Sequence, residues 1–121
     1  MLFRSKSICV VQKQQLTLLT DTDNDGVADL YECLSQDWGF TGNYHDFSFG
    51  PIVDKAGNFH VLRTGNRGLY DIPFQGWDIA INPINGKATP VCSGLRSPDG
   101  FGTYGSNGDI FMTDKIGRAH V

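Results

Sequence analysis

The sequence predicts an all-β fold built from repeated four-stranded units. Composition is the first reason: of 13 acidic residues only Glu32 is a glutamate, and Ala occurs five times against 15 Gly. Helix formers are therefore scarce and turn formers plentiful. A regular spacing of strand-like runs is the second reason. The third is an Asn-Gly pair between apolar residues, which is a strong hairpin signal.

Three strand-like runs recur at a constant interval along the chain. They cover residues 7–11, 58–62 and 109–113. Their first apolar residues are Ile8, Phe59 and Ile110, and 51 positions separate each from the next. Gly57 and Gly108 precede the second and third runs, which suits a tight turn before each strand. The spacing predicts a repeat of about 50 residues.

Further strands flank these runs in a matching order. They are predicted at 15–20 and 28–35 in the first repeat, at 77–82 and 87–93 in the second, and at 47–53 and 100–104 before the two glycine turns. An Asp-rich stretch links the first of these pairs, and a turn through Asn85-Gly86 links the second. Each repeat is thus interpreted as four strands.

Four strands in about 50 residues are typical of a β-propeller blade. Residues 1–115 are therefore predicted to form a partial, truncated propeller. Its first blade covers about 1–35, its second about 47–93, and the start of a third about 100–115. A propeller closes with about four to eight blades, so the remaining blades are needed for closure. A coincidental spacing in a β-sandwich is the alternative.

The two ends of the chain receive separate interpretations. The tail at 116–121 resembles the translation of a sequencing-library adapter, so we give it no functional role and expect a fragment whose natural continuation is missing. Residues 1–11 lack the features of a signal peptide. No apolar run approaches the roughly 20 residues of a membrane span.

Charge and cysteine content exclude several classes of protein. Ten basic and 13 acidic residues give a net charge of −3, so we expect no nucleic-acid partner and no binding to an anionic membrane. Cys9, Cys33 and Cys92 are too few for a disulfide scaffold or a zinc site. In the blade model a strand separates Cys9 from Cys33, so these thiols are predicted to be free and buried.

The most specific chemical signal is the Asp-rich loop, residues 21–32, which reads DTDNDGVADLYE. Acids occupy its positions 1, 3, 5, 9 and 12 and glycine its position 6, which is the EF-hand calcium pattern. The predicted calcium ligands are Asp21, Asp23, Asp25, the carbonyl of Val27, Asp29 and Glu32. Five carboxylates so close together repel one another without a cation, which is a physical reason to expect Ca²⁺.

Two alternatives to a calcium-bound hairpin remain open. The loop is also compatible with a solvated acidic turn that holds no metal. Residues 11–19 and 30–34 are compatible with the flanking helices of a true EF-hand, which would make the chain a regulatory calcium-binding protein. Alternation and threonines in 15–20 favour a strand over the first of those helices.

Several segments resemble one bacterial family. They are LTLLTDTDNDGVAD at 16–29, DWG at 37–39 with GNYH at 42–45, DKAGNF at 54–59, and GLRSPDG at 94–100. Together they are similar to the glucose/sorbosone-dehydrogenase-like β-propellers, described as membrane-bound dehydrogenases, some of which carry a c-type haem domain. The resemblance covers about residues 7–114 and implies an extracytoplasmic protein: periplasmic, secreted or membrane-associated.

The resemblance also implies an active site. Better-understood relatives are six-bladed sugar dehydrogenases that use pyrroloquinoline quinone (PQQ), with a catalytic histidine before an inner strand and an arginine in a Gly-x-Arg-Asn segment that contacts the quinone. His45 and Arg96 match these two positions as catalytic base and cofactor contact. The sequence departs from the family at Ser97, which replaces the asparagine, and at Asp46 and Phe47, which replace glycines.

The repeat brings these two residues together independently of the resemblance. His45 and Arg96 are 51 positions apart, so they occupy equivalent loops at one end of successive blades. The Asp-rich loop is predicted at the opposite end. The first functional hypothesis is therefore a dehydrogenase that oxidises a sugar or polyol hydroxyl by hydride transfer to a quinone. The second is a non-catalytic, calcium-stabilised propeller that binds a glycan or a protein.

Overall fold

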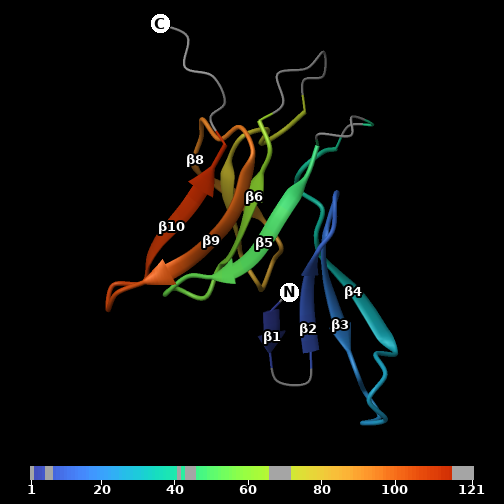
Figure 1. Ribbon diagram of the computed structural model, residues 1–121. Coiled ribbons are helices and arrows are strands. Elements are labelled where there is room, and N and C mark those ends of the chain that lie inside the picture. Colours follow the sequence, from blue (N-terminus) through green and yellow to red (C-terminus); the bar gives the residue numbers. More distant parts are fainter. Residues whose placement is uncertain (1, 5–6, 41, 43–45, 66–71, 116–121) are drawn as a thin grey trace, which may run out of the picture.

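The computed structural model describes residues 2–4, 7–40, 42, 46–65 and 72–115, which form three antiparallel sheets and no helix (Figure 1). The strands are β1 (Leu2–Arg4), β2 (Ser7–Val11), β3 (Leu16–Thr20), β4 (Leu30–Ser35), β5 (Ser48–Val53), β6 (Phe59–Arg63), β7 (Asp78–Ile81), β8 (Ala88–Cys92), β9 (Pro98–Tyr104) and β10 (Asp109–Asp114). A membrane-spanning helix is accordingly absent from these ranges. The all-β prediction is confirmed.

The first sheet is a meander in the order β1-β2-β3-β4. Cys9 pairs with Leu18 and Val11 with Leu16, so these four side chains share one face of the sheet. Cys9 and Leu16 are fully buried on that face. The strand alternation in the sequence is therefore what directs these apolar residues to a common core.

The second sheet repeats the meander in the order β5-β6-β7-β8. Phe59 pairs with Ile81 and Val61 with Ile79, which places four buried apolar side chains on one face. Gly57, with a φ of 90°, closes the turn before β6 as its sequence position predicts. This apolar face and that of the first sheet form the core, together with Trp38.

Polar contacts join the first two sheets across this core. The hydroxyl of Ser35 donates to the carbonyl of Gly86 at 2.6 Å, and the hydroxyl of Ser48 on β5 donates to the carbonyl of Lys13 in the β2–β3 turn at 3.0 Å. Gly86 has a φ of 70°, and a Cβ there would lie 2.1 Å from the carbonyl oxygen of Leu34. Only glycine therefore permits this close approach of the two sheets.

The third sheet contains β9 and β10 alone. It packs on the second sheet through Phe101, whose ring would lie 3.1 Å from a Cβ on Gly50 of β5. The opposite face carries Tyr104 and Phe111, which are 77% and 60% exposed and whose rings meet edge to face at 6.3 Å. That face therefore presents an exposed pair of aromatic rings.

The positions of β2 to β10 agree with the sequence prediction to within about two residues, whereas no separate run was predicted for β1. The strands on both sides of the Asp-rich loop exclude the EF-hand helices.

The three cysteines are free, as predicted, but only Cys9 is buried. The prediction of burial is wrong for Cys33 and Cys92 because they lie on β4 and β8, the outer strands of the two meanders, where the side chains are largely exposed. None of the three sheets closes on itself, so the propeller stays a prediction.

Candidate functional site

The Asp-rich loop links β3 to β4 and curls back on itself (Figure 1). Asn24 and Gly26 adopt positive φ angles of 63° and 88°, which bend the backbone around the first three aspartates. One carboxylate oxygen from each of Asp21, Asp23 and Asp25 lies within 4.8 Å of the others. The sequence spacing therefore gathers three carboxylate oxygens that could hold a metal ion, and oxygen is the ligand atom that Ca²⁺ prefers.

Backbone N–H groups hold these carboxylates in place. Gly26 N–H donates to Asp21 Oδ2 at 2.8 Å, and Val27 N–H donates to Asp25 Oδ1 at 2.8 Å. The N–H of Asp25 is shared between Asp21 and Asp23, each at 3.3 Å. The Gly26 hydrogen bond is the main reason that the pKa of Asp21 is lowered. The backbone of the loop thus holds the three carboxylates together before any ion binds.

Two other predicted ligands, Asp29 and Glu32, lie outside this group. Both oxygens of Asp29 accept hydrogen bonds from Thr22, from its N–H at 2.9 Å and its hydroxyl at 2.6 Å, and these bonds lower the pKa of Asp29. Glu32 lies on β4 opposite Leu18 and is exposed. The structure therefore brings together three of the five predicted carboxylate ligands, because β4 begins before position 12 of the loop.

Arg96 lies in the loop between β8 and β9, with an exposed side chain. The backbone of this loop is fixed on two sides. The N–H groups of Arg96 and Ser97 donate to the carboxylate of Asp114 on β10, at 3.0 and 2.7 Å. The carbonyl of Arg96 accepts from the N–H of Gly65, at 2.9 Å. The guanidinium therefore projects from a backbone that both the second and the third sheets hold.

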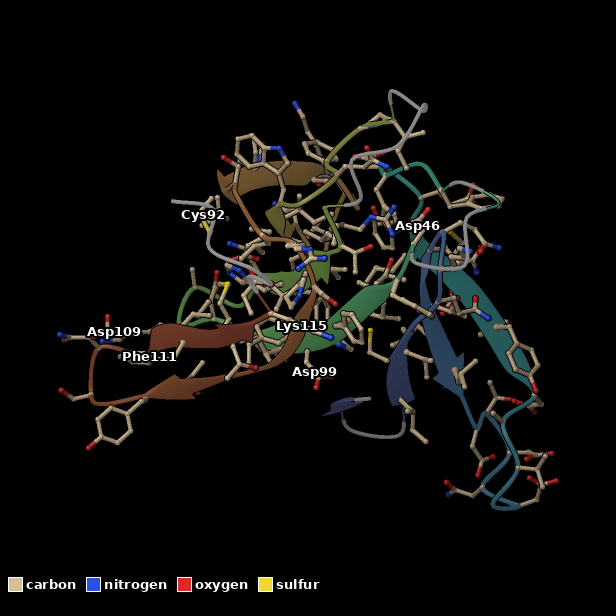
Figure 2. All side chains as sticks on the ribbon, turned by 45° about the horizontal axis from the view of Figure 1, so that its top comes forward. Asp46, Cys92, Asp99, Asp109, Phe111 and Lys115 are labelled. Carbon is tan, nitrogen blue, oxygen red and sulfur yellow. The ribbon has the colours of Figure 1, made fainter. Side chains whose placement is uncertain are left out.

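His45, the predicted catalytic base, lies outside the described residues. The chain is described again from Asp46, which leads into β5 (Figure 2). β5 and β9 lie side by side and run in the same direction, so the segments that precede them are at one end of the molecule, whereas the Asp-rich loop is at the other end (Figure 1). The described residues that lead into β5 and β9 are therefore far from the Asp-rich loop.

A buried charge cluster that the sequence did not predict lies at the end of β6. Arg63, at the end of β6, is 0% exposed and pairs with Asp46 at 3.0 Å. Its Nη1 donates to Ser48 Oγ and its Nη2 to the carbonyl of Gly39, both at 2.6 Å. The signal in the sequence was an arginine at the end of an otherwise apolar strand. Such a residue is seldom buried without a partner.

A second buried cluster was also missed. His60 on β6 contacts the carboxylate of Asp54 through Nε2 and that of Asp78 through Nδ1. His60 is 4% exposed and Asp78 2%. Both side chains are therefore almost completely withdrawn from solvent.

Comparisons with family models, with curated proteins and with solved structures gave no match for this chain. The residues and their geometry therefore carry the functional argument.

Proposed function

We propose that this chain is a segment of an extracytoplasmic, calcium-stabilised β-propeller that resembles sugar dehydrogenases. The observation that carries the proposal is the repeated meander. Four antiparallel strands occur twice in the same spatial order, and the first two strands of a third unit follow. Successive sheets contact one another through β2 and β5 and then through β5 and β9. Sheets stacked through their early strands are what a radial propeller requires.

The proposed active site lies where the chain enters the inner strands. There His45 takes the proton of a sugar or polyol hydroxyl, a task suited to a base that titrates near neutral pH. The exposed guanidinium of Arg96, on its fixed loop, stabilises negative charge on the cofactor. PQQ, when bound, accepts the hydride. The support for PQQ in this chain is that one exposed cation on a fixed backbone, and the remaining blades would supply the rest of the pocket.

The proposed calcium site has a different role. Its three gathered carboxylates sit on the β3–β4 hairpin, at the end of the molecule opposite the segments that lead into β5 and β9, so the ion would stabilise the β3–β4 connection and take no part in oxidation. Outside the cytoplasm, calcium at about millimolar concentration would fill even a weak site of this kind. A c-type haem domain elsewhere in the protein would serve as the electron acceptor.

One observation favours a second candidate, a non-catalytic propeller that binds a glycan or a protein. Asp46, next to His45, is 1% exposed and paired with Arg63. A position that the resemblance assigns to an active-site glycine is therefore occupied by a structural anchor. Such an anchor favours a rigid binding loop over the glycine-containing active-site loop that the resemblance implies.

A dehydrogenase assay on the full-length protein separates the two candidates. We would add PQQ and Ca²⁺ to metal-free protein and follow dye reduction with aldoses and polyols, using His45→Ala and Arg96→Ala variants. Lys87→Ala, at an exposed cation in the β7–β8 turn, is the matched control. Turnover that needs PQQ, is lost in His45→Ala and survives in Lys87→Ala supports the enzyme. Absence of PQQ binding in protein that calcium still stabilises supports the binding module.

A further inference from the structure

The imidazole of His60 lies between two carboxylates on the face of the second sheet that is turned away from the apolar core. Its Nε2 is 2.8 Å from Asp54 Oδ2, and its Nδ1 is 3.0 and 3.1 Å from the two oxygens of Asp78. Ionised carboxylates only accept hydrogen bonds, so both ring nitrogens must donate. Only the doubly protonated imidazolium carries two N–H groups. The geometry therefore requires a charged His60.

When the His60 ring loses one of its two protons, one of its contacts with a carboxylate becomes unfavourable. A neutral imidazole has one bare nitrogen, which would face a carboxylate oxygen across about 3 Å in a site with little water. His60 and Asp78 are 4% and 2% exposed, so solvent cannot replace the lost donor at Nδ1. Asp54 is more accessible, since 18% of its side chain is exposed. The Nε2 contact is therefore the one that opens.

Asp54 connects this contact to the turn between β5 and β6. Its other oxygen, Oδ1, accepts the N–H of Asn58 at 2.9 Å, and its backbone carbonyl accepts the N–H of Gly57 at 3.0 Å. The same turn reaches the third sheet: Lys55 Nζ donates to the carbonyl of Ser106 at 3.4 Å. A histidine that releases Asp54 thus loosens a turn that contacts the β9–β10 connection.

We propose that His60 is a pH-sensitive latch, which when protonated holds the β5–β6 turn against β7 and, through Lys55, against the β9–β10 turn. This inference does not depend on the proposed function. It concerns the contact between the second and third sheets, whatever chemistry the whole protein performs.

The charged groups around the latch define its pH range. Burial lowers the pKa of His60, but hydrogen bonds and charges from Asp78 and Asp54 outweigh burial and raise it above its ordinary 6.5. Burial also raises the pKa of the Cys92 thiol on β8, with a further contribution from Asp78, so this thiol stays neutral beside the latch at neutral pH. Lys55 is the remaining charged group in the turn.

The sign follows from the raised pKa of His60. A histidine that is more basic when folded contributes its stabilisation fully below pH 6.5 and loses it as the pH rises through the folded-state pKa. Asp54 acts in the opposite direction: its pKa is lowered below 3.8, because the hydrogen bonds from His60 and Asn58 outweigh burial. The latch is therefore closed from mildly acidic pH up to the raised pKa of His60.

Nuclear magnetic resonance of the 121-residue chain tests the latch between pH 5 and 9.5. The ¹⁵N shifts of the His60 ring should show two protonated nitrogens at pH 6.5, and the ring should titrate above that value. The amide exchange rates of Asn58 and Gly57 should rise about tenfold as the ring deprotonates. Each rate is first divided by the intrinsic rate of an unstructured peptide at the same pH. The rise of about tenfold corresponds to the loss of one charged hydrogen bond.

The Asp54→Asn variant sharpens the test. Its amide oxygen still accepts the N–H of Asn58, while its NH₂ group donates to a neutral Nε2, so exchange at Asn58 should no longer depend on the protonation of His60. Asp99→Asn, at an exposed carboxylate on β9, is the matched control and should behave like the wild type.

Two results would overturn the proposal. One is a His60 ring that carries a single N–H at pH 6.5. The other is a ring that titrates while exchange at Asn58 stays constant. Both are read from the wild-type chain, so the conclusion holds even if Asp54→Asn does not fold.

Discussion

Replacing Arg63 by Met should remove much of the stability of this chain. The guanidinium is fully buried, pairs with Asp46, and bonds to Ser48 and to the carbonyl of Gly39. Met fills most of the volume but leaves a buried carboxylate without its cation. Breaking one side of a buried ion pair costs about 3–5 kcal/mol. A domain of this size is stable by only about 5–15 kcal/mol.

Urea denaturation followed by tryptophan fluorescence measures this loss, because Trp38 lies in the core between the same two sheets. Lys87→Met, at an exposed cation, is the control and should change the free energy of unfolding by less than about 0.5 kcal/mol. Asp46→Asn should itself be destabilising, but it should cost less in the Arg63→Met background than in the wild type, by at least about 1 kcal/mol. A loss below about 1 kcal/mol for Arg63→Met, or additive effects in the double variant, would refute a buried and energetically coupled Arg63–Asp46 pair.

Three further predictions concern the loop, the sheet contact and the open face. Calcium should raise the Tm of the wild-type chain and bind measurably by calorimetry. Asp23→Asn should weaken both effects, whereas the control Asp99→Asn should not. Equal calcium binding by the two variants would contradict a site at the gathered carboxylates. Gly86→Ala should lower the free energy of unfolding in urea by about 1–3 kcal/mol, because the φ of this residue is 70° and the new Cβ would meet the carbonyl of Leu34. In the control Gly42→Ala, the new Cβ meets no atom within 4 Å. An effect no larger than that of the control would argue against close approach of the sheets. Phe111→Ser should change the free energy of unfolding by less than about 0.5 kcal/mol but reduce the binding of a hydrophobic dye. Unchanged dye fluorescence would show that the dye does not bind at the exposed face formed by Tyr104 and Phe111.

The strands were predictable from the sequence because their signals are local. The runs that became β2, β6 and β10 carry apolar residues with turn glycines before two of them, and Asn85-Gly86 predicted the β7–β8 hairpin. The cluster of Asp21, Asp23 and Asp25 was predictable for the same reason, since five residues and one glycine determine it.

The buried polar clusters could not be predicted, because their partners are distant in the sequence. Arg63 meets a carbonyl 24 residues away, and His60 meets a carboxylate 18 residues away. The local sequence around Arg63 or His60 does not predict which residue will be its partner. Glu32 shows the opposite error: its spacing matches a motif, but strand pairing with Leu18 decides where it lies.

The contacts between the first two sheets also bear on how quickly the chain folds. Ser35 meets Gly86, and Asp37 meets the N–H of Ala88, each across 51 residues of sequence, whereas strands within a meander pair across short turns. Closing a long loop costs entropy before its contacts return any stabilisation. Each meander should therefore form early, and docking of one meander on the other should limit the rate. Mutations at Ser35 or Gly86 should then slow the final step and leave the early formation of β-structure unchanged.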